Sequence, residues 1–382
     1  MLVGTGCSDD PAGDTPPEPV VDLAKLDVGP YPKVERPVTT TPSWALARYF
    51  EGVRLSSVVP LPVEIDPQFV VPQAGNLNPA FPRPGEDLTK RFDATFDEDT
   101  KGLIAGFGTA ARSHEDLNIS QGIAIQALLF DSVGAAQSAA AALHRRGFGP
   151  DATVEPIKSA RHSDALLWWR PDQQRVTGWM ATGRFVIRVG SWSDENKELE
   201  ISDLSAVLPL ADKALTITAE RLQAHTPTPV DRLQSIAIDP DNMLVRTLSL
   251  GLENGTDPAY PMVRDARAAL HGARDFADMR RMNEQAGVDR VSEDKATVYR
   301  TRDVASARWF LAEVGHDKFL RPVEDPVGLA AANCYEYIGP AVVSRYFCAV
   351  SHDRYVAVVS SEQLPDARQS ISAQYVILVN AG

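Results

Sequence analysis

The sequence predicts an α+β protein made of two tandem homologous units, each an antiparallel sheet covered by helices. Three observations predict this class: one order of elements occurs twice, alternating strand patterns are separated by turn residues, and helical patterns begin at capping residues. The chain has 382 residues, of which 44% are hydrophobic. It can therefore bury a large core, and its length suits two domains better than one.

The repeat consists of three pairs of matching segments, each separated by about 170 residues. They are residues 63–67 with 236–240, 130–136 with 301–307, and 184–189 with 354–359. Because the pairs keep their order and nearly the same spacing, we interpret the chain as a duplicated domain. The boundary falls near Thr226-Pro227-Thr228-Pro229. We expect a lipobox remnant and Pro-rich tether over residues 1–40, a first unit over 41–225, and a second unit over 226–382.

Each unit is predicted as strand, helix, meander, helix. In the first unit, residues 123–130 form a buried strand, Asp131 or Ser132 caps a helix that runs through Arg146, and Gly147 ends it. Three alternating segments (165–169, 175–182 and 184–191) form the meander, and a long helical pattern covers 204–222. In the second unit the matching elements are a strand over 296–300, a helix over 304–314, a hairpin, a strand over 355–359 and a final helix opened by Pro365. We expect the helices to cover one face of each sheet.

The N-terminus predicts a lipid anchor on Cys7. Small residues precede this cysteine, and the polar, Pro-rich residues 8–19 after it have no large apolar side chain with which to pack. Gly4 stands where Leu is usual, and only a short stretch precedes Cys7, so we expect the upstream codons to encode a charged segment and an apolar run. The alternative is a chance cysteine near a ragged terminus.

The other two cysteines, Cys334 and Cys348, lie symmetrically about Ala341 in a strand-turn-strand pattern, with Gly339-Pro340 as the turn. They can face each other across a hairpin, and a disulfide there would persist only in an oxidising compartment. The alternative is a pair of buried free thiols in a cytosolic protein. With the lipid anchor, the disulfide indicates an extracytoplasmic location at the outer face of the cell membrane.

Charge and hydropathy exclude some partners. The net charge of −13 disfavours nucleic acid, because phosphate backbones would be repelled. No run of about 18 apolar residues occurs, so a membrane association would depend on the lipid alone.

Three segments carry a family resemblance: Leu23 to Pro32, the Cys334 and Cys348 pair, and the Arg354 to Val359 strand. In these the chain, from about Val21 onward, resembles a family of actinobacterial envelope lipoproteins of unknown function. The resemblance implies a cell-envelope location and no particular reaction. The short lipobox is where this sequence departs from the family.

No catalytic motif is found. Residues 106–111 are the nearest approach to a Gly-rich phosphate loop, but no Lys follows them. The seven histidines show no metal-ligand spacing, so we expect no metal site and no cofactor. His162-Ser163-Asp164 contains the residue types of a catalytic triad, but neighbouring side chains on an extended chain diverge, so a solvated loop is the better interpretation.

The aromatic residues of the meander suggest a binding surface. Trp168 and Trp169 must point to opposite sheet faces. An exposed Trp beside Arg170 or Arg175, with Trp179 near it, could bind a sugar or a protein. That these side chains belong to the core is nevertheless the better interpretation.

The leading functional hypothesis is a non-catalytic, lipid-anchored envelope protein that binds an envelope protein or a cell-wall or lipid ligand at the groove between the units. The alternatives are a lipid or glycolipid carrier with an apolar cavity, and a hydrolase with an unfamiliar site.

Overall fold

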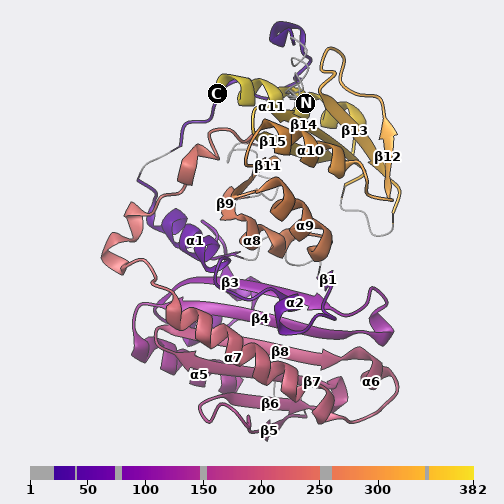
Figure 1. The fold of residues 1–382 in the computed structure, drawn as a ribbon. Helices are drawn as coiled ribbons and strands as arrows, with labels where there is room; N and C mark the ends of the chain where they lie inside the picture. The colour runs from indigo at the N-terminus through magenta and orange to yellow at the C-terminus, as the bar shows by residue number, and fades with distance from the viewer. Residues whose placement is uncertain (1–20, 39–40, 74–79, 147–152, 250–259, 340–343) are drawn as a thin grey trace, which may run out of the picture.

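The computed structural model describes residues 21–38, 41–73, 80–146, 153–249, 260–339 and 344–382 (Figure 1). In this part of the chain the first sheet has eight strands, in the order β1-β3-β4-β8-β7-β6-β5, and β2 pairs with β3. All pairs are antiparallel. The strands are β1 (Val71–Pro72), β2 (Ala80–Phe81), β3 (Leu103–Arg112), β4 (Gln121–Phe130), β5 (Glu155–Ile157), β6 (Leu166–Arg170), β7 (Arg175–Thr182) and β8 (Phe185–Ser193).

The second sheet has seven strands among the described residues, in the order β12-β13-β14-β15-β11-β10-β9, and is also antiparallel throughout. The strands are β9 (Met262–Asp265), β10 (Arg290–Glu293), β11 (Ala296–Arg300), β12 (Leu320–Val323), β13 (Ala332–Tyr337), β14 (Tyr346–His352) and β15 (Tyr355–Ser361).

Helices connect these strands in both units. Those of the first unit are α1 (Trp44–Leu55), α2 (Pro62–Ile65), α3 (Leu88–Arg91), α4 (Phe96–Asp99), α5 (Val133–Arg146), α6 (Asp194–Glu198) and α7 (Leu208–Ala224). Those of the second unit are α8 (Ala266–Ala269), α9 (Phe276–Ala286), α10 (Val304–Val314) and α11 (Leu364–Asn380). The helix starts follow the capping signals. Ser132 accepts a hydrogen bond from the amide of Ala135 before α5, and Asp303 accepts one from Ser306 before α10.

The two sheets have the same topology. From β3 onward, the strands and long helices of the first unit have counterparts in the second: β3 with β10, β4 with β11, α5 with α10, β5 to β8 with β12 to β15, and α7 with α11, whereas the short helix α6 has none. Individual hydrogen bonds also match, since the amide of Phe130 donates to Arg184 O at 2.8 Å and that of Thr301 to Arg354 O at 2.9 Å. The predicted fold class, two tandem α+β units, is confirmed.

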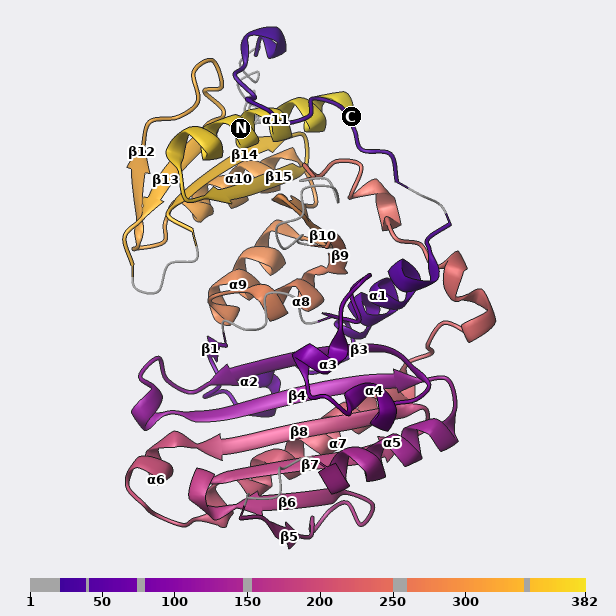
Figure 2. The ribbon, with the colours of Figure 1, turned by 180° about the vertical axis from the view of Figure 1, so that it is seen from behind.

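Helices lie on both faces of each sheet, so the expectation that they cover one face is wrong. In the first unit α7 packs on one face and α5 on the other; in the second, α11 and α10 do the same (Figures 1 and 2). Along β8, Phe185 belongs to the core under α7 and Val186 to the core under α5. Consecutive apolar residues in a strand are the sequence signal of burial on both faces.

The Gly-rich segment 106–111 is the middle of β3 and not a loop. A Cβ atom on Gly106 would lie 2.2 Å from the ring of Phe81, and one on Gly52 of α1 would lie 2.8 Å from Gly106 O. The glycines therefore allow α1 and β2 to approach β3 closely.

The chain ends do not follow the sequence-based domain borders. Residues 22–38 lie along the second unit, where Leu26 and Val28 are buried and Tyr31 Oη donates to Asp366 of α11 at 2.6 Å. Conversely, the segment after α7 contacts the first unit, since the amide of Thr228 donates to Glu51 of α1 at 2.9 Å. The described part of the segment predicted as a tether is thus docked on the unit that comes last in the sequence.

The two units meet through α1 on one side and β9, α8 and the 3-10 turn Leu270–Gly272 on the other (Figure 1). One connected hydrophobic cluster extends from α7 through α1 to α11. Tyr49 Oη donates to Tyr260 O at 3.2 Å, and Tyr260 Oη donates to Pro84 O at 2.6 Å. The units therefore share a continuous packed core.

Candidate functional site

The predicted aromatic surface is not formed, because its tryptophans lie under helices. Trp169 is 3% exposed in the core under α7, and Trp179 is 2% exposed in the core under α5. Trp168 is half-buried on the α5 side, stacks on the imidazole of His144 at 4.6 Å, and donates from Nε1 to His144 O at 2.9 Å. The two neighbouring tryptophans do point to opposite faces, as the strand pattern predicts, but neither offers an open ring to a ligand.

The charged residues singled out near these tryptophans have local partners. Arg170 donates to Asp172 at 3.1 Å at the end of β6. His162 Nε2 lies 2.8 Å from Thr216 Oγ1 on α7, whereas Ser163 donates to Asp164. His162 thus turns to α7 and away from Ser163 and Asp164, so the three residues form no catalytic relay.

The structure joins Cys334 and Cys348 in a disulfide between β13 and β14. They are directly paired in the strand register, with their Cα atoms 4.1 Å apart. The turn residues Pro340 and Ala341 lie outside the described residues, and so does the proposed lipidation site Cys7.

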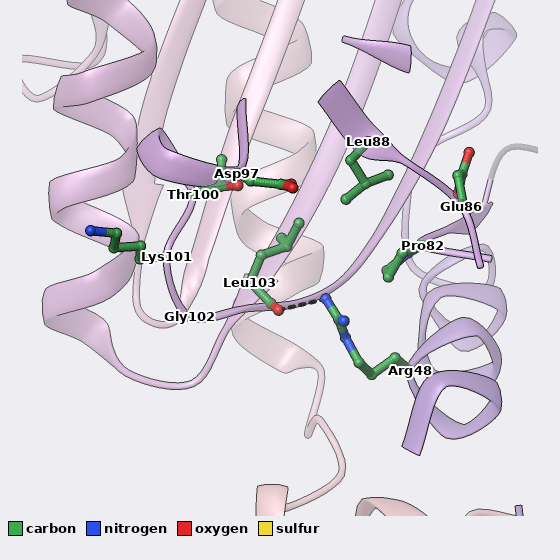
Figure 3. A pocket seen from close by; sticks show the side chains of 9 residues that line it. All are labelled: Arg48, Pro82, Glu86, Leu88, Asp97, Thr100, Lys101, Gly102 and Leu103. Atoms are coloured by element: carbon green, nitrogen blue, oxygen red, sulfur yellow. Dashed lines mark hydrogen bonds between the residues drawn. The ribbon is translucent and has the colours of Figure 1, made fainter. Parts of the chain in front are cut away.

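One surface depression of about 290 Å³ lies on the first unit near the junction (Figure 3). It is lined by Arg48, Pro82, Glu86, Leu88, Asp97, Thr100, Lys101, Gly102 and Leu103. Arg48 of α1 donates from Nε to Ile104 O at 2.8 Å and from a terminal nitrogen to Leu103 O at 2.9 Å. Burial lowers the pKa of this guanidinium, and Asp97 opposes the shift.

The side chains that line this depression are arranged as on an ordinary packed surface and not as in a reaction centre. In Figure 3 the side chains of Lys101 and Glu86 lie on opposite sides and do not converge. Glu86 accepts a hydrogen bond from Arg91 at 2.9 Å, and the Thr100 hydroxyl donates to Phe96 O at 2.7 Å. The lining therefore offers no nucleophile hydrogen-bonded to a base. A second pocket of about 200 Å³ lies between Pro171 and Ser202 and is lined mostly by polar residues.

Two ionisable side chains are strongly perturbed at the junction between the units. His271 is fully buried: its Nε2 lies 3.2 Å from Ser56 O and its Nδ1 lies 3.1 Å from Thr109 Oγ1. A carbonyl can only accept, so Nε2 carries the proton and Nδ1 accepts from Thr109. Burial, together with the nearby Arg267 and Arg264, lowers the pKa of His271 to about 3.

Glu64 of α2 forms the charged part of the junction. Its carboxylate accepts from Arg221 of α7 at 2.8 Å and from Arg267 of α8 at 2.6 Å. Burial alone would raise the pKa of Glu64, but these two hydrogen bonds and the positive charge of Arg267 outweigh it and lower the pKa to about 2. No local pattern predicts these contacts, because both arginines lie far from Glu64 along the chain and Arg267 belongs to the other unit. The ion pair with Arg267 holds the two units together, and both ion pairs occupy the place where a groove was expected.

The described residues contain neither a metal-type cluster nor a membrane-spanning helix. No group of three or more His, Cys, Asp or Glu side chains is arranged to hold a metal ion there. Within the same residues, every helix is too short or too polar to cross a membrane.

No curated protein and no solved structure matches the chain. Two family models do match, and together they cover both units. Residues 38–238 match the N-terminal part of a domain of unknown function, DUF7373, and residues 242–381 match its C-terminal part. The division between the models, after the 3-10 segment Val230–Ser235, agrees with the contacts of that segment with the first unit. The chain belongs to the DUF7373 family of two-part domains of unknown function.

Proposed function

We propose that this protein is a non-catalytic binding protein of the cell envelope, held at the outer face of the membrane by a lipid on Cys7. The disulfide between Cys334 and Cys348 carries the proposal. Disulfides persist in oxidising compartments, whereas the reducing cytosol keeps thiols free. The small residues before Cys7 and the Pro-rich stretch after it support the lipid anchor.

The docking of residues 22–38 on α11 determines which unit a lipid on Cys7 would hold near the membrane. Tyr31 Oη donates to Asp366, and Gln369 donates to Asp27 at 3.0 Å, so this segment starts on the second unit. Residues 8–20 could span at most about 45 Å when fully extended. A lipid on Cys7 would therefore hold the second unit nearer to the membrane than the first.

Binding is favoured over catalysis by the chemistry of the surface. The depression around Arg48 presents no paired nucleophile and base, and the perturbed groups His271 and Glu64 are enclosed at the junction. A lipid or glycolipid carrier would need a deep apolar cavity. The two pockets described above are small and are lined mostly by polar residues, so we place binding of an envelope protein or cell-wall ligand first.

The test is to express the gene with its upstream codons in a host that processes lipoproteins, beside a Cys7→Ser variant. We expect the wild-type protein in the membrane fraction, with an acylated N-terminal peptide in mass spectrometry, and the variant released. A thiol titration of the unfolded, unreduced protein should find neither Cys334 nor Cys348 free. An unmodified Cys7 in membrane fractions would remove the anchor, and two free thiols at 334 and 348 would remove the envelope location.

A further inference from the structure

One end of the first sheet carries arginines on a face without a covering helix. Figure 2 shows α5 and α4 over the end of this face away from α6, whereas no described helix lies over the end toward α6. Three arginines from different strands lie in this part of the face: Arg112 of β3, Arg175 of β7 and Arg188 of β8. We call these three residues the arginine face.

The strand register fixes the arrangement of this face. In one row across β3, β4, β8 and β7 lie Arg112, Gly122, Trp192 and Arg175. On the same four strands the next row contains only small residues: Ala110, Ala124, Gly190 and Thr177. The third row places Gln126 beside Arg188. The row of small residues therefore lies between two rows that carry arginine side chains.

The indole of Trp192 contacts the other three residues of the first row. A Cβ atom on Gly122 would lie 2.0 Å from the Trp192 ring, so the indole lies over this glycine. The guanidinium of Arg175 stacks on the indole at 4.3 Å. Trp192 Nε1 donates to Asp194 at 3.0 Å, and the same carboxylate is paired with Arg112.

The positive charges of Arg175 and Arg188 are not neutralised by an ion pair within the described residues, whereas Arg112 is paired with Asp194. Arg188 donates to the amide oxygen of Gln126 at 3.1 Å, and Arg175 has its ring contact with Trp192; neither is in an ion pair. Burial, then repulsion from Arg188, Arg112 and Arg170, lowers the pKa of Arg175 to about 10, although Asp194 opposes the shift. Partly buried cations without a carboxylate cost free energy, which is notable in a chain with a net charge of −13.

The second unit shows that the fold does not require these charges. Val358 takes the place of Arg188 in the matching register, and Thr297 takes that of Gln126. Arg345, which matches Arg175, is paired with Glu336 at 2.6 Å. The same scaffold is therefore built with an aliphatic residue and a neutralised arginine, so the charges of the first unit call for a functional explanation.

We propose that the arginine face binds a ligand bearing carboxylate or phosphate groups, held by the guanidiniums of Arg175 and Arg188 above the small residues Ala124 and Gly190. Guanidinium groups present planar pairs of donors that match the oxygens of carboxylate and phosphate. The proposal rests on the binding function proposed above and adds the chemical class of the ligand. The anionic group could belong to a soluble molecule or to a lipid headgroup.

Binding can be measured by titration calorimetry on the full chain at low salt. The probes are inorganic phosphate, glucuronate, and vesicles of phosphatidylglycerol, with glucose and phosphatidylcholine vesicles as uncharged or zwitterionic controls. We expect the anionic probes to bind and the controls not to. Binding of phosphate or glucuronate would assign a soluble ligand, and binding of phosphatidylglycerol vesicles alone would assign a headgroup. If no anionic probe binds, the proposal is wrong.

The variants Arg188→Gln and Arg175→Gln should each weaken anion binding by about tenfold. Arg345→Gln is the matched control, since it removes the same charge from the equivalent position of the second unit, and it should change binding by less than about twofold. Equal losses in all three variants would mean that net charge alone attracts the probe. Arg188→Val, which copies the second unit, should fold with an unchanged or higher Tm while losing binding.

The outcome is separable from that of the anchor experiment. Cys7→Ser should leave anion binding unchanged, because Cys7 is not part of the face. If the anion binds but Cys7 is never acylated, the envelope assignment fails and the arginine face stands. If Cys7 is acylated but no anion binds, the envelope assignment stands and the proposal for the arginine face is wrong.

Discussion

The two units share one topology, yet they fill one matched cross-strand position in different ways. In the second unit β13 and β14 pair Cys334 with Cys348, which form the disulfide. In the first unit the equivalent strands β6 and β7 pair Leu167 with Gly178. A Cβ atom on Gly178 would lie 2.1 Å from Leu167 Cδ2, so the leucine occupies the space above the glycine. The comparison teaches that the position needs filling, and that a covalent bond is one of two solutions.

The units also differ at one matched end of the sheet. In the first unit, long strands end in the connection that contains the 3-10 turn Leu117–Ile119 and in α6, where the amide of Asp194 donates to Ser120 O at 2.8 Å. In the second, β10 and β11 join through Asp294 and Lys295, and the N-terminal segment covers this turn. Arg36 pairs with Asp294 at 2.5 Å. One end thus carries arginines on a face without a covering helix, whereas the N-terminal segment covers the other end.

The largest effect should come from removing the segment that closes the second unit. Deleting residues 1–38 removes the buried Leu26 and Val28 and the ion pair to Asp294, which is 4% exposed. At about 1.5–3 kcal/mol for each buried side chain, we expect the free energy of unfolding to fall by about 5 kcal/mol. Denaturant unfolding measures the loss. Lys25→Ala, at a side chain 82% exposed, is the control and should change little.

Hydrogen exchange tells where that loss falls. Amides of β10, β11 and the start of α11 should exchange faster, while those of β4 and β8 keep their protection. Equal acceleration in both sheets would show that the segment stabilises the whole molecule and not the second unit alone.

The next effect concerns the disulfide. We expect Cys348→Ser to lower the free energy of unfolding by about 2–4 kcal/mol without abolishing the fold, because the first unit folds with no disulfide at the matching site. Thermal unfolding and hydrogen exchange should place most of the loss in the second unit. The double variant Cys334→Leu with Cys348→Gly copies the first unit and should recover more than half of the loss. A double variant less stable than Cys348→Ser would refute the equivalence of the two solutions.

A third effect is set by pH at the junction that holds the two units together. The folded pKa of His271 is about 3, below its ordinary value of about 6.5, so protonation favours unfolding. Stability from this group is complete above pH 6.5 and is lost as pH falls toward 3. Between pH 6.5 and 4.5 the loss should be about 2.3 kcal/mol, because the slope approaches about 1.4 kcal/mol per pH unit only below about pH 6. His271→Gln should be less stable at pH 7 but lack this slope, and an unchanged slope would mean that other groups cause it.

The smallest effect tests the equivalence of two hairpin turns. Gly183 and Asp353 open the loops between β7 and β8 and between β14 and β15, with φ of +54° and +49°. A side chain is disfavoured in this left-handed region. We expect Asp353→Gly to raise the free energy of unfolding by about 0.5 kcal/mol and Gly183→Asp to lower it by about 1 kcal/mol. Denaturant midpoints measured side by side should move in opposite directions; a shift in the same direction would contradict the match.

Local patterns were sufficient for the repeated part of the fold. The predicted strands 175–182 and 296–300 and the helix 304–314 coincide with β7, β11 and α10. These elements have caps, turn residues and an apolar period that act within a few residues. Strand β3 was not predicted, because its glycines are typical of a loop. These glycines make room for Phe81 and α1, which lie elsewhere in the sequence.

The sequence by itself determined the duplication, the order of the elements and the pairing of Cys334 with Cys348, because each follows from spacing along one stretch of chain. Only the tertiary structure decided which tryptophans are buried, where the N-terminal segment docks, and that His271 is enclosed by Ser56 and Thr109. The arginine face, too, is decided only by the tertiary structure. Its residues come from three strands, and the register between strands sets which side chains become neighbours. That register is fixed by packing on both faces of the sheet, which no single segment encodes.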